Sequence, residues 1–418
     1  MKKTLHFLLL VLLSLSVQAQ TWTASTPAAG TFYLYNIGYD GFLVGSNNWT
    51  TRASLTKVGG IPVVLQQADT DDSFYISTSP TYDGRFLGSD GYVDKSNTDN
   101  YTAWQFIPVE GQQDTYLLLA KATNNYLVGH DTDATKTSLT ATSPNNERGY
   151  WKLATKENLI QNLANATKQS PIDATFALIN PHFGLNGTTS VWNGDYWDYG
   201  GVNDNKCIEQ WNRTFDMYQT ITGLPNGVYQ MQCQGFYRVG NGINDATKAA
   251  EARTNGNEQL LAYYYINNTE APLKSIFDYS LGTTNNSTYN TSAGLSVNGQ
   301  TVYVPNSLDR ASACFLAGEY LNEPITAVVT DGTIRVGFRK NTANQDDWAA
   351  YDNVTLTYLG IDLTALTSQY QSLLQTAQDL QQQPMLAAVK NTLDEAVSNA
   401  QANPNLDDHT WLDRKSVV

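Results

Sequence analysis

The chain of 418 residues has little of what common catalytic and structural motifs require. It contains three cysteines and four scattered histidines, so a disulfide scaffold, a histidine-based zinc site and a Ser-His-Asp triad have no supporting pattern. Basic residues are also scarce, because 25 Lys and Arg stand against 39 Asp and Glu, a formal charge of −14. This balance disfavours nucleic acid and anionic membranes as partners and favours neutral ligands or a divalent cation.

Long apolar runs are absent apart from one near the N-terminus, from Leu8 to Leu15. That run follows the basic pair Lys2-Lys3 and precedes the small-residue pattern Val17-Gln18-Ala19, which together indicate a secretory signal peptide over 1–19. It is too short to span a membrane comfortably, and no later stretch reaches about 20 consecutive apolar residues. We therefore expect an exported soluble protein, located in the periplasm, at the outer surface or outside the cell.

A short apolar segment that ends in glycine occurs three times. The closing glycines, at positions 45, 88 and 129, are 43 and 41 residues apart, so one supersecondary unit is used three times. We predict twelve short strands from Thr31 to about Leu153, in a domain over 20–154. The three copies are Gly41-Phe42-Leu43-Val44-Gly45, Gly84-Arg85-Phe86-Leu87-Gly88 and Asn125-Tyr126-Leu127-Val128-Gly129.

A Trp-led strand follows in two repeats, as Trp104-Gln105-Phe106 and Trp151-Lys152-Leu153, and Pro62-Val63-Val64-Leu65 takes its place in the first. This arrangement resembles the β-trefoil of ricin-type lectins. The resemblance implies sugar pockets built from an acidic residue, an aromatic ring and an amide. The alternative is that Asp-Gly pairs simply form hairpin turns. The nearest matching residues are Tyr39, Asp40, Asn47 and Trp49, then Asp83, Asp90 and Tyr92, then Asn125, His130 and Asp131.

A second strand-rich segment, 171–360, opens with Phe176–Phe183 and closes with Asp347–Tyr358. The turn Leu224-Pro225-Asn226-Gly227 and the strand Val228 to Tyr237 lie between them. These residues resemble galactose-binding-like carbohydrate-binding modules of exported Bacteroidetes proteins, which implies a jelly-roll β-sandwich whose first and last strands lie together. The fold class we predict is mainly β, a β-trefoil followed by a jelly-roll β-sandwich, with a C-terminal α-helical hairpin.

Helices are predicted in two places. Thr155 can cap a helix over 156–166 in a linker of residues 155–170. Beyond Gly360, Asp362 can cap one helix and Pro384 suits the first turn of another. Two antiparallel helices bury little by themselves, so we expect the tail over 361–418 to lack a third helix or a further domain.

The densest group of binding-type side chains lies in the loop 191–201, where Trp192, Tyr196, Trp197 and Tyr199 alternate with Asp and Asn. Aromatic rings beside carboxylate and amide acceptors suit the apolar face and hydroxyl rim of a sugar. We expect Tyr196 and Tyr199 to contact ligand more often than the tryptophans. The alternative is that Trp192 or Trp197 folds back to cover the sandwich core.

Glu209 and Trp211 precede a strand and could line the same end of the sandwich as Arg238. Arg238 could hold a carboxylate or vicinal hydroxyls, or it could form a structural ion pair with Glu209. The resemblance also implies a structural calcium ion near the last strand. Asp352 and Asn180 are the candidate ligands, because calcium takes hard oxygen donors.

These observations favour an exported, non-catalytic protein that binds glycans weakly at more than one site. No Gly-x-Ser-x-Gly, His-Glu-x-x-His or phosphate-binding loop occurs, and the predicted domains leave no segment long enough for a catalytic domain. A glycosidase needs only two carboxylates, so a hydrolase or its accessory region stays an alternative. Another alternative is a spacer that positions a catalytic domain or a surface protein and binds no sugar.

Overall fold

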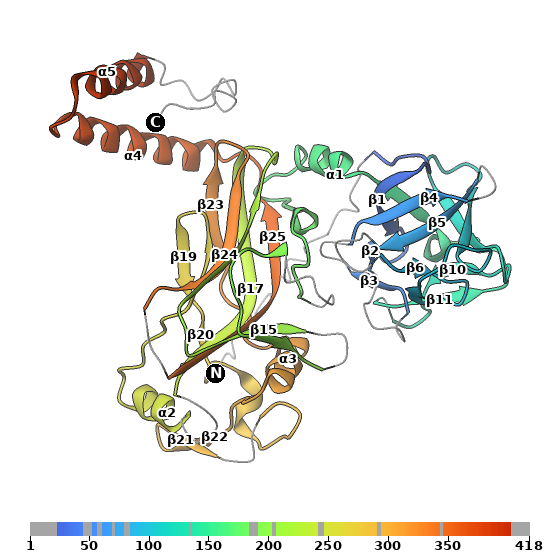
Figure 1. Ribbon diagram of the computed structural model, residues 1–418, viewed down its shortest axis with the longest axis horizontal. Coiled ribbons are helices and arrows are strands. Elements are labelled where there is room, and N and C mark those ends of the chain that lie inside the picture. The colour runs from blue at the N-terminus through green and yellow to red at the C-terminus, as the bar shows by residue number, and fades with distance from the viewer. Residues whose placement is uncertain are drawn as a thin grey trace, which may run out of the picture.

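The protein is mainly β and consists of a β-barrel, a two-sheet β-sandwich and a helical hairpin (Figure 1). The predicted signal peptide and the candidate residues Asn47, Trp49 and Asp83 lie outside the described residues. The computed structural model describes residues 23–44, 52–56, 61–68, 72–78, 84–133, 135–183, 191–202, 206–240, 246–290, 294–342 and 346–402.

Twelve short strands come first in the chain, as the threefold repeat predicts. Six of them form a closed ring, in which β1 pairs with β4, β4 with β5, β5 with β8, β8 with β9, β9 with β12 and β12 with β1. The others form three hairpins, β2–β3, β6–β7 and β10–β11. A six-stranded barrel with three hairpins is the β-trefoil topology. The bounds are β1 (Gly30–Asn36), β2 (Gly41–Val44), β3 (Ser54–Thr56), β4 (Val63–Gln67), β5 (Ser73–Thr78), β6 (Phe86–Leu87), β7 (Val93–Lys95), β8 (Ala103–Pro108), β9 (Tyr116–Ala120), β10 (Tyr126–Gly129), β11 (Thr137–Thr140) and β12 (Trp151–Ala154).

Two tryptophans repeat the same contact in the trefoil core. Trp104 and Trp151 are fully buried, and each indole Nε1 donates a 2.9 Å hydrogen bond to a leucine carbonyl, of Leu87 and Leu127 respectively. Both leucines belong to the repeated glycine-ended segment. Val63 occupies the equivalent position in the first repeat, opposite Phe32 on β1. The indole bond therefore ties the last strand of a repeat to its hairpin, because a buried N–H must find an acceptor.

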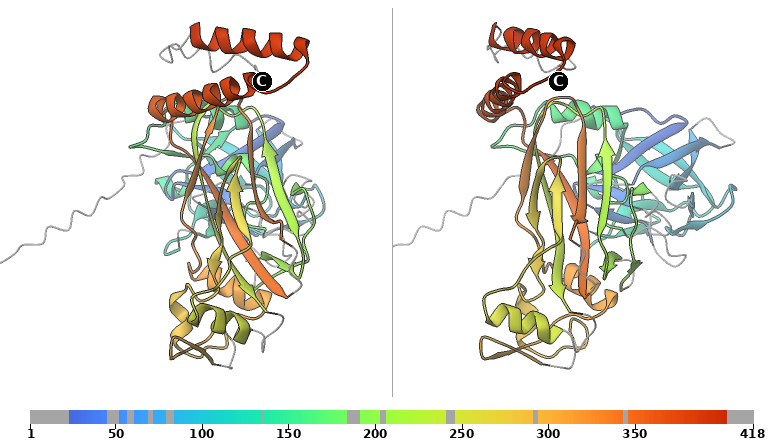
Figure 2. Two further views of the ribbon diagram at one scale, coloured as in Figure 1. Left: turned by 90° about the vertical axis from the view of Figure 1, so that its left-hand side faces the viewer. Right: turned by 60° about the vertical axis from the view of Figure 1, so that its left-hand side comes forward.

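Helix α1 (Lys156–Leu163) follows the trefoil. Thr155 caps it, since its hydroxyl accepts the Asn158 N–H while the Asn158 side chain accepts the Thr155 N–H. The helix ends three residues earlier than predicted. The trefoil also touches the sandwich directly through Tyr33, whose hydroxyl donates a 3.0 Å hydrogen bond to the Phe176 carbonyl. Figure 2 shows the trefoil beside the sandwich with α1 at the junction.

The sandwich is built from two sheets with the orders β14-β15-β25-β17-β20 and β16-β24-β18-β19, while β13 adds to β25 and β23 adds to β17. The first and last strands, β13 and β25, lie side by side as predicted, with Ile172 opposite Tyr358. The first strand precedes the predicted opening segment Phe176–Phe183, which begins in a 3-10 turn, Thr175–Ala177. The bounds are β13 (Ile172–Asp173), β14 (Asp198–Gly200), β15 (Cys207–Trp211), β16 (Phe215–Ile221), β17 (Gly227–Val239), β18 (Tyr263–Ile266), β19 (Thr269–Pro272), β20 (Lys274–Ser275), β23 (Ile325–Val329), β24 (Ile334–Lys340) and β25 (Asp347–Tyr358).

Aromatic side chains fill both faces of the larger sheet. Between the sheets, Phe338 and Tyr351 stack with ring centroids 3.8 Å apart. On the outer face, Phe236 packs against Tyr320 and Trp348. The outer face is covered by α2 (Ala246–Thr254), α3 (Leu308–Leu316) and the hairpin of β21 (Leu295–Val297) and β22 (Gln300–Val302). These elements gather at one end of the sandwich, the lower end in Figure 1.

The tail forms two helices, α4 (Leu363–Gln381) and α5 (Ala387–Ala402), which project from the other end of the sandwich (Figure 1). The Tyr370 hydroxyl donates to the Ala400 carbonyl and joins the two helices. Several apolar side chains of the hairpin are exposed, among them Leu373, Leu386 and Val389. Within the described residues, no helix combines the length and the hydropathy that a membrane span requires.

Candidate binding pocket

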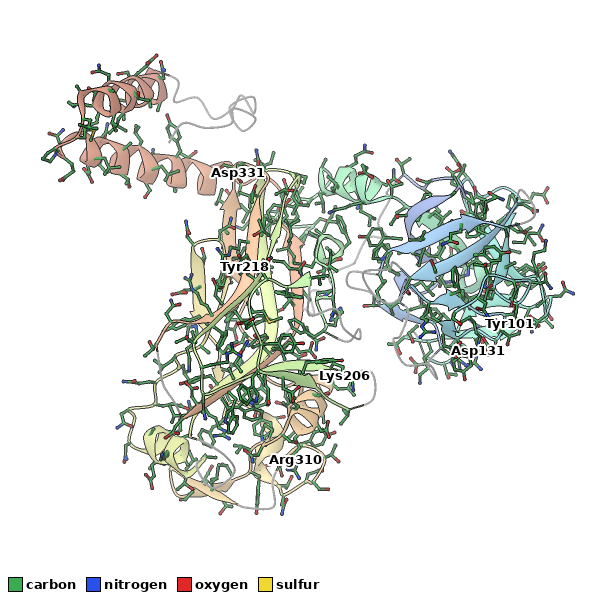
Figure 3. The ribbon with its side chains drawn as sticks, viewed as in Figure 1. Tyr101, Asp131, Lys206, Tyr218, Arg310 and Asp331 are labelled. Carbon is green, nitrogen blue, oxygen red and sulfur yellow. The ribbon has the colours of Figure 1, made fainter. Side chains whose placement is uncertain are left out.

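A pocket of about 380 Å³ opens where the β14–β15 hairpin meets the start of α3. Lys206, directly before β15, and Arg310, in α3, mark this end of the sandwich in Figure 3. The pocket is lined by three indoles, one carboxylate and one amide, together with a serine and a leucine. The lining residues are Trp197, Glu209, Trp211, Asn306, Ser307, Leu308 and Trp348.

Strand alternation places Glu209 and Trp211 on the same face of β15. Trp211 lies directly opposite Trp348 on β25, with ring centroids 6.4 Å apart. The Trp348 Nε1 donates a 2.9 Å hydrogen bond to Glu209 Oε2. The sheet register therefore brings the two indoles and the carboxylate together.

Trp197 forms the outer edge of the pocket and is 59% exposed. Its backbone N–H donates a 3.1 Å hydrogen bond to the Glu209 carbonyl. The preceding residues are also fixed, because Gln210 Nε2 donates to the Asp195 carbonyl and Arg213 Nη1 to the Tyr196 carbonyl. These bonds hold the loop in place and present the Trp197 ring to solvent.

Arg238 lies behind the pocket and is 1% exposed. Its guanidinium carbon lies 5.9 Å from the ring centroid of Trp211 and 5.3 Å from that of Trp348. Nη2 donates a 2.9 Å hydrogen bond to Asn306 Oδ1, and Nη1 donates to the Gly240 carbonyl. Glu209 and Arg238, both described, do not form the ion pair considered from the sequence. Burial prevents Arg238 from touching a ligand, so its role is to support the indoles and Asn306.

The electrostatics of the pocket centre on Glu209. Partial burial raises the pKa of this carboxyl, the hydrogen bond from Trp348 lowers it, and the charge of Asp198 raises it. The net effect is a pKa above the ordinary value, because desolvation disfavours the charged form and the cross-strand partner Asp198 adds a like charge.

The prediction that Trp192 contacts ligand is wrong, because Trp192 belongs to the sandwich core. It is 2% exposed, packs against Phe183 with centroids 5.1 Å apart, and donates from Nε1 to the Asn180 carbonyl at 3.2 Å. Of the two tryptophans considered as core covers, Trp192 takes that role and Trp197 does not.

Tyr196 and Tyr199 are half-buried and pack partly against the sandwich core. Their rings make an edge contact at 6.3 Å, and neither lines the pocket. The expectation that these tyrosines contact ligand more often than the tryptophans finds no support in this arrangement, since their rings pack against each other and the protein.

In the first trefoil repeat, the predicted sugar residues are engaged inside the domain. The Tyr39 hydroxyl donates to the His130 carbonyl in the third repeat. The Tyr39 ring packs so closely on Gly129 that a Cβ atom there would lie 2.2 Å from it. Asp40 accepts a hydrogen bond from the Tyr35 hydroxyl and has φ +48°. This backbone conformation matches the hairpin-turn alternative.

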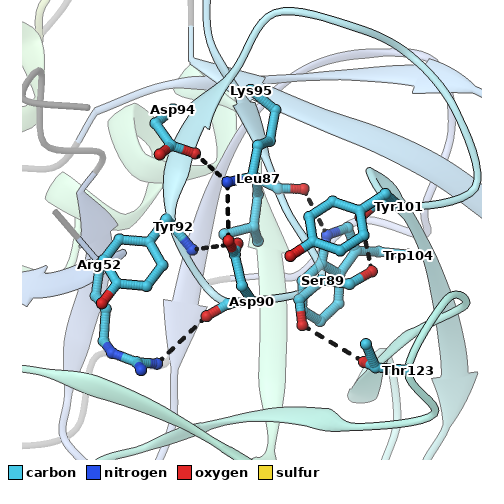
Figure 4. A network of polar contacts seen from close by, with 10 residues as sticks. All are labelled: Arg52, Leu87, Ser89, Asp90, Tyr92, Asp94, Lys95, Tyr101, Trp104 and Thr123. Atoms are coloured by element: carbon cyan, nitrogen blue, oxygen red, sulfur yellow. Dashed lines mark hydrogen bonds and ion pairs between the residues drawn. The ribbon is translucent and has the colours of Figure 1, made fainter. Parts of the chain in front are cut away.

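The second repeat uses its candidate residues in a polar network, shown in Figure 4. Asp90 forms a 2.8 Å ion pair with Lys95 and accepts the Tyr92 N–H. Burial raises the pKa of Asp90, but Lys95 and the Tyr92 N–H outweigh it and hold the pKa below its ordinary value. Arg52 lies over the Tyr92 ring at 4.9 Å. Both candidate side chains are therefore bound within the trefoil.

The two candidate calcium ligands differ in their surroundings. Asn180, at φ +50°, uses its carbonyl to accept the Trp192 Nε1–H. Asp352 is fully buried; its Oδ1 accepts the Asn353 N–H, and its Oδ2 has no hydrogen-bond partner in the described part of the chain. Desolvation raises the pKa of Asp352 well above its ordinary value. A proton or a cation would satisfy this oxygen, so the calcium site stays a prediction.

The sequence did not identify Trp348, Asn306, Ser307 and Leu308 as pocket residues. Trp348 stands in the closing strand that the sequence identified, and the signal that could have found it is the register between that strand and β15. Asn306 and Leu308 flank Ser307, whose hydroxyl caps α3 by accepting the Arg310 N–H. A Ser cap before an apolar run is visible in a sequence, but its proximity to Trp211 is not.

No protein-family model matches the chain, and no curated protein does. Some solved structures are similar to part of the chain, at low sequence identity and low TM-score. A structure described as "SeviL bound to asialo-GM1 saccharide" is 18% identical, with a TM-score of 0.26, and the match covers 31% of this chain and 99% of that one. A Polyporus squamosus lectin is 11% identical (TM-score 0.26; 31% and 50% covered), and a GH43 β-1,3-galactosidase is 14% identical (TM-score 0.27; 32% and 29% covered). The trefoil assignment rests on the strand pairing above.

Proposed function

We propose that this protein binds carbohydrate in the pocket at the β14–β15 end of the sandwich and does not cleave it. The observation that carries the proposal is the 59% exposed indole of Trp197, held by backbone bonds at the rim of a pocket that also contains Glu209. A fixed aromatic surface beside a hydrogen-bond acceptor matches the apolar face and hydroxyl edge of a sugar ring.

Binding is favoured over hydrolysis because Glu209 is the carboxylate that lines the described pocket. Glycoside hydrolysis requires two carboxyl groups across the scissile bond. Asp198 neighbours Glu209 on β14, but it is not a lining residue, and its Oδ1 accepts the Tyr199 N–H. A spacer that binds no sugar gives no reason for an indole to stay exposed at a pocket, and Trp197 is 59% exposed.

Export accompanies this proposal. The basic start, apolar run and cleavage pattern of residues 1–19 support a signal peptide, and we place the mature protein in the periplasm, at the outer surface or outside the cell. One shallow pocket gives weak affinity, so attachment to a larger assembly or a repeated glycan would strengthen capture by multivalency.

The test is a glycan array with the mature protein and its Trp197→Ala variant, with and without calcium. We expect binding in the wild-type protein that is lost in the variant. Binding that persists in the variant would move the site to the trefoil, and a folded wild-type protein that binds no glycan would support the spacer function.

A further inference from the structure

Glu209 is a carboxylate in an aromatic pocket and has no cationic partner among the described residues. It accepts one hydrogen bond, from Trp348 Nε1, and its cross-strand neighbour is a second acid, Asp198. No Lys, Arg or His of the described residues forms an ion pair with it. Its Oε1 atom makes no hydrogen bond to any described residue and so is available to a ligand.

Arg238 does not supply the missing positive charge. Its guanidinium carbon lies within 6 Å of the ring centroids of Trp211 and Trp348, and the group donates to the Gly240 carbonyl and Asn306 Oδ1. At 1% exposure it is closed off from the pocket. The charge that a ligand meets on entering is therefore that of the carboxylates.

A partly desolvated carboxylate is stabilised most by a cation brought to it, and indole rings also attract cations. We infer that the pocket selects glycans that carry free amino groups, of the glucosamine type, over their N-acetylated and hydroxyl counterparts. This inference rests on the proposed function, because it names the class of sugar that the same pocket takes.

The ammonium group of such a sugar donates to Glu209 Oε1, while the pyranose ring of the same sugar stacks on the Trp197 indole. N-acetylation removes the positive charge and adds bulk, and a hydroxyl donates a hydrogen bond without a full charge. The charged hydrogen bond is the stronger interaction, which sets the order of preference.

Titration calorimetry with three β-linked tetrasaccharides of glucosamine, N-acetylglucosamine and glucose tests the inference. At about pH 6 the amine is protonated. We expect the glucosamine tetramer to bind about tenfold more tightly than the other two, and this advantage to shrink as salt is added.

The matched variants are Glu209→Gln, which removes the charge and keeps an oxygen for Trp348 Nε1, and Glu110→Gln, an exposed carboxylate on the trefoil. Glu209→Gln should abolish the preference for the amine over the neutral tetramers, whereas Glu110→Gln should retain it. Thermal melting of both variants verifies that they fold.

Equal binding of the three tetramers, or a preference that survives Glu209→Gln, would overturn the inference and leave carbohydrate binding intact. Failure to bind any of the three, together with no effect of Trp197→Ala on a glycan array, would overturn the proposed function as well.

Discussion

The trefoil and the sandwich offer the same kinds of side chain at their surfaces and use them differently. In the trefoil, Tyr39 is bonded to the third repeat and Asp90 to Lys95. In the sandwich, Trp197 is 59% exposed, and Glu209 uses only Oε2 in hydrogen bonds to the part of the chain that the structure describes. An aromatic residue next to an acid is therefore not sufficient evidence for a sugar site. Such a pair can bind a ligand only if other residues of the domain do not already pack against the ring and hydrogen-bond the acid.

The largest expected effect falls on trefoil stability. Trp151→Ala removes a fully buried indole and its hydrogen bond to Leu127, which should lower the free energy of unfolding by about 3–5 kcal/mol. Urea denaturation measures this loss, and titration with a glycan should show an unchanged pocket. A parallel loss of glycan affinity in the folded variant would mean that the two regions are not separate in function.

Trp197→Ala should have the opposite pattern: glycan affinity should fall and stability should stay nearly the same. The side chain is 59% exposed, so the free energy of unfolding should change by less than about 0.5 kcal/mol. Loss of a central aromatic contact should weaken glycan binding by about 2 kcal/mol. Calorimetry and thermal melting on the same sample separate the two, and a large drop in melting temperature with intact affinity would count against the pocket.

Tyr39→Phe sharpens the comparison from the trefoil side. It removes the hydroxyl that donates to the His130 carbonyl and should cost about 1 kcal/mol of stability. Binding on a glycan array should be the same as that of the wild-type protein. If the array signal disappears while the fold is retained, Tyr39 contacts sugar after all.

The smallest effect at acid pH is expected for Asp352→Asn. Burial raises the pKa of Asp352 well above its unfolded value of about 4. Below that value the acid is protonated in both the folded and the unfolded state, and stability falls as the pH rises from there through the folded pKa. The Asn variant should lack this loss, as melting temperatures across a pH series would show.

Calcium is the variable to add to that series. A calcium ion held by Asp352 would restore the stability of the wild-type protein at high pH and would have no effect on Asp352→Asn. A flat profile for the wild-type protein contradicts the burial argument, and a calcium effect that persists in the variant excludes Asp352 as its ligand.

The sequence was sufficient for elements that repeat or close on themselves. The spacing of the glycine-ended segments predicted twelve strands, and the positions of Trp104 and Trp151 marked equivalent strands. The proximity of the first and last sandwich strands was also predicted, although β13 lies before the expected segment Phe176–Phe183. Local chemistry and symmetry decide these features, so one chain is enough to infer them.

The pocket was only half visible, because its members meet through register. Trp197, Glu209 and Trp211 stood out as binding-type residues, but Trp348 joins them only because β25 pairs with β15 at Trp211. The same limitation explains Trp192 and Arg238. The type of a residue suggests which interactions it can make. Whether the residue is buried depends on which element of the fold covers it, and the local sequence does not show this.

Strand β25 has a consequence for the order in which the molecule matures. It carries Trp348 of the pocket near one end and pairs with β13 near the other, so the pocket is completed by the last strand of the sandwich to be synthesised. Contacts so distant along the chain make folding slow. A nascent chain that stops short of β25 therefore has the aromatic loop but an incomplete pocket, and a ligand of that pocket cannot assist folding until the domain is closed.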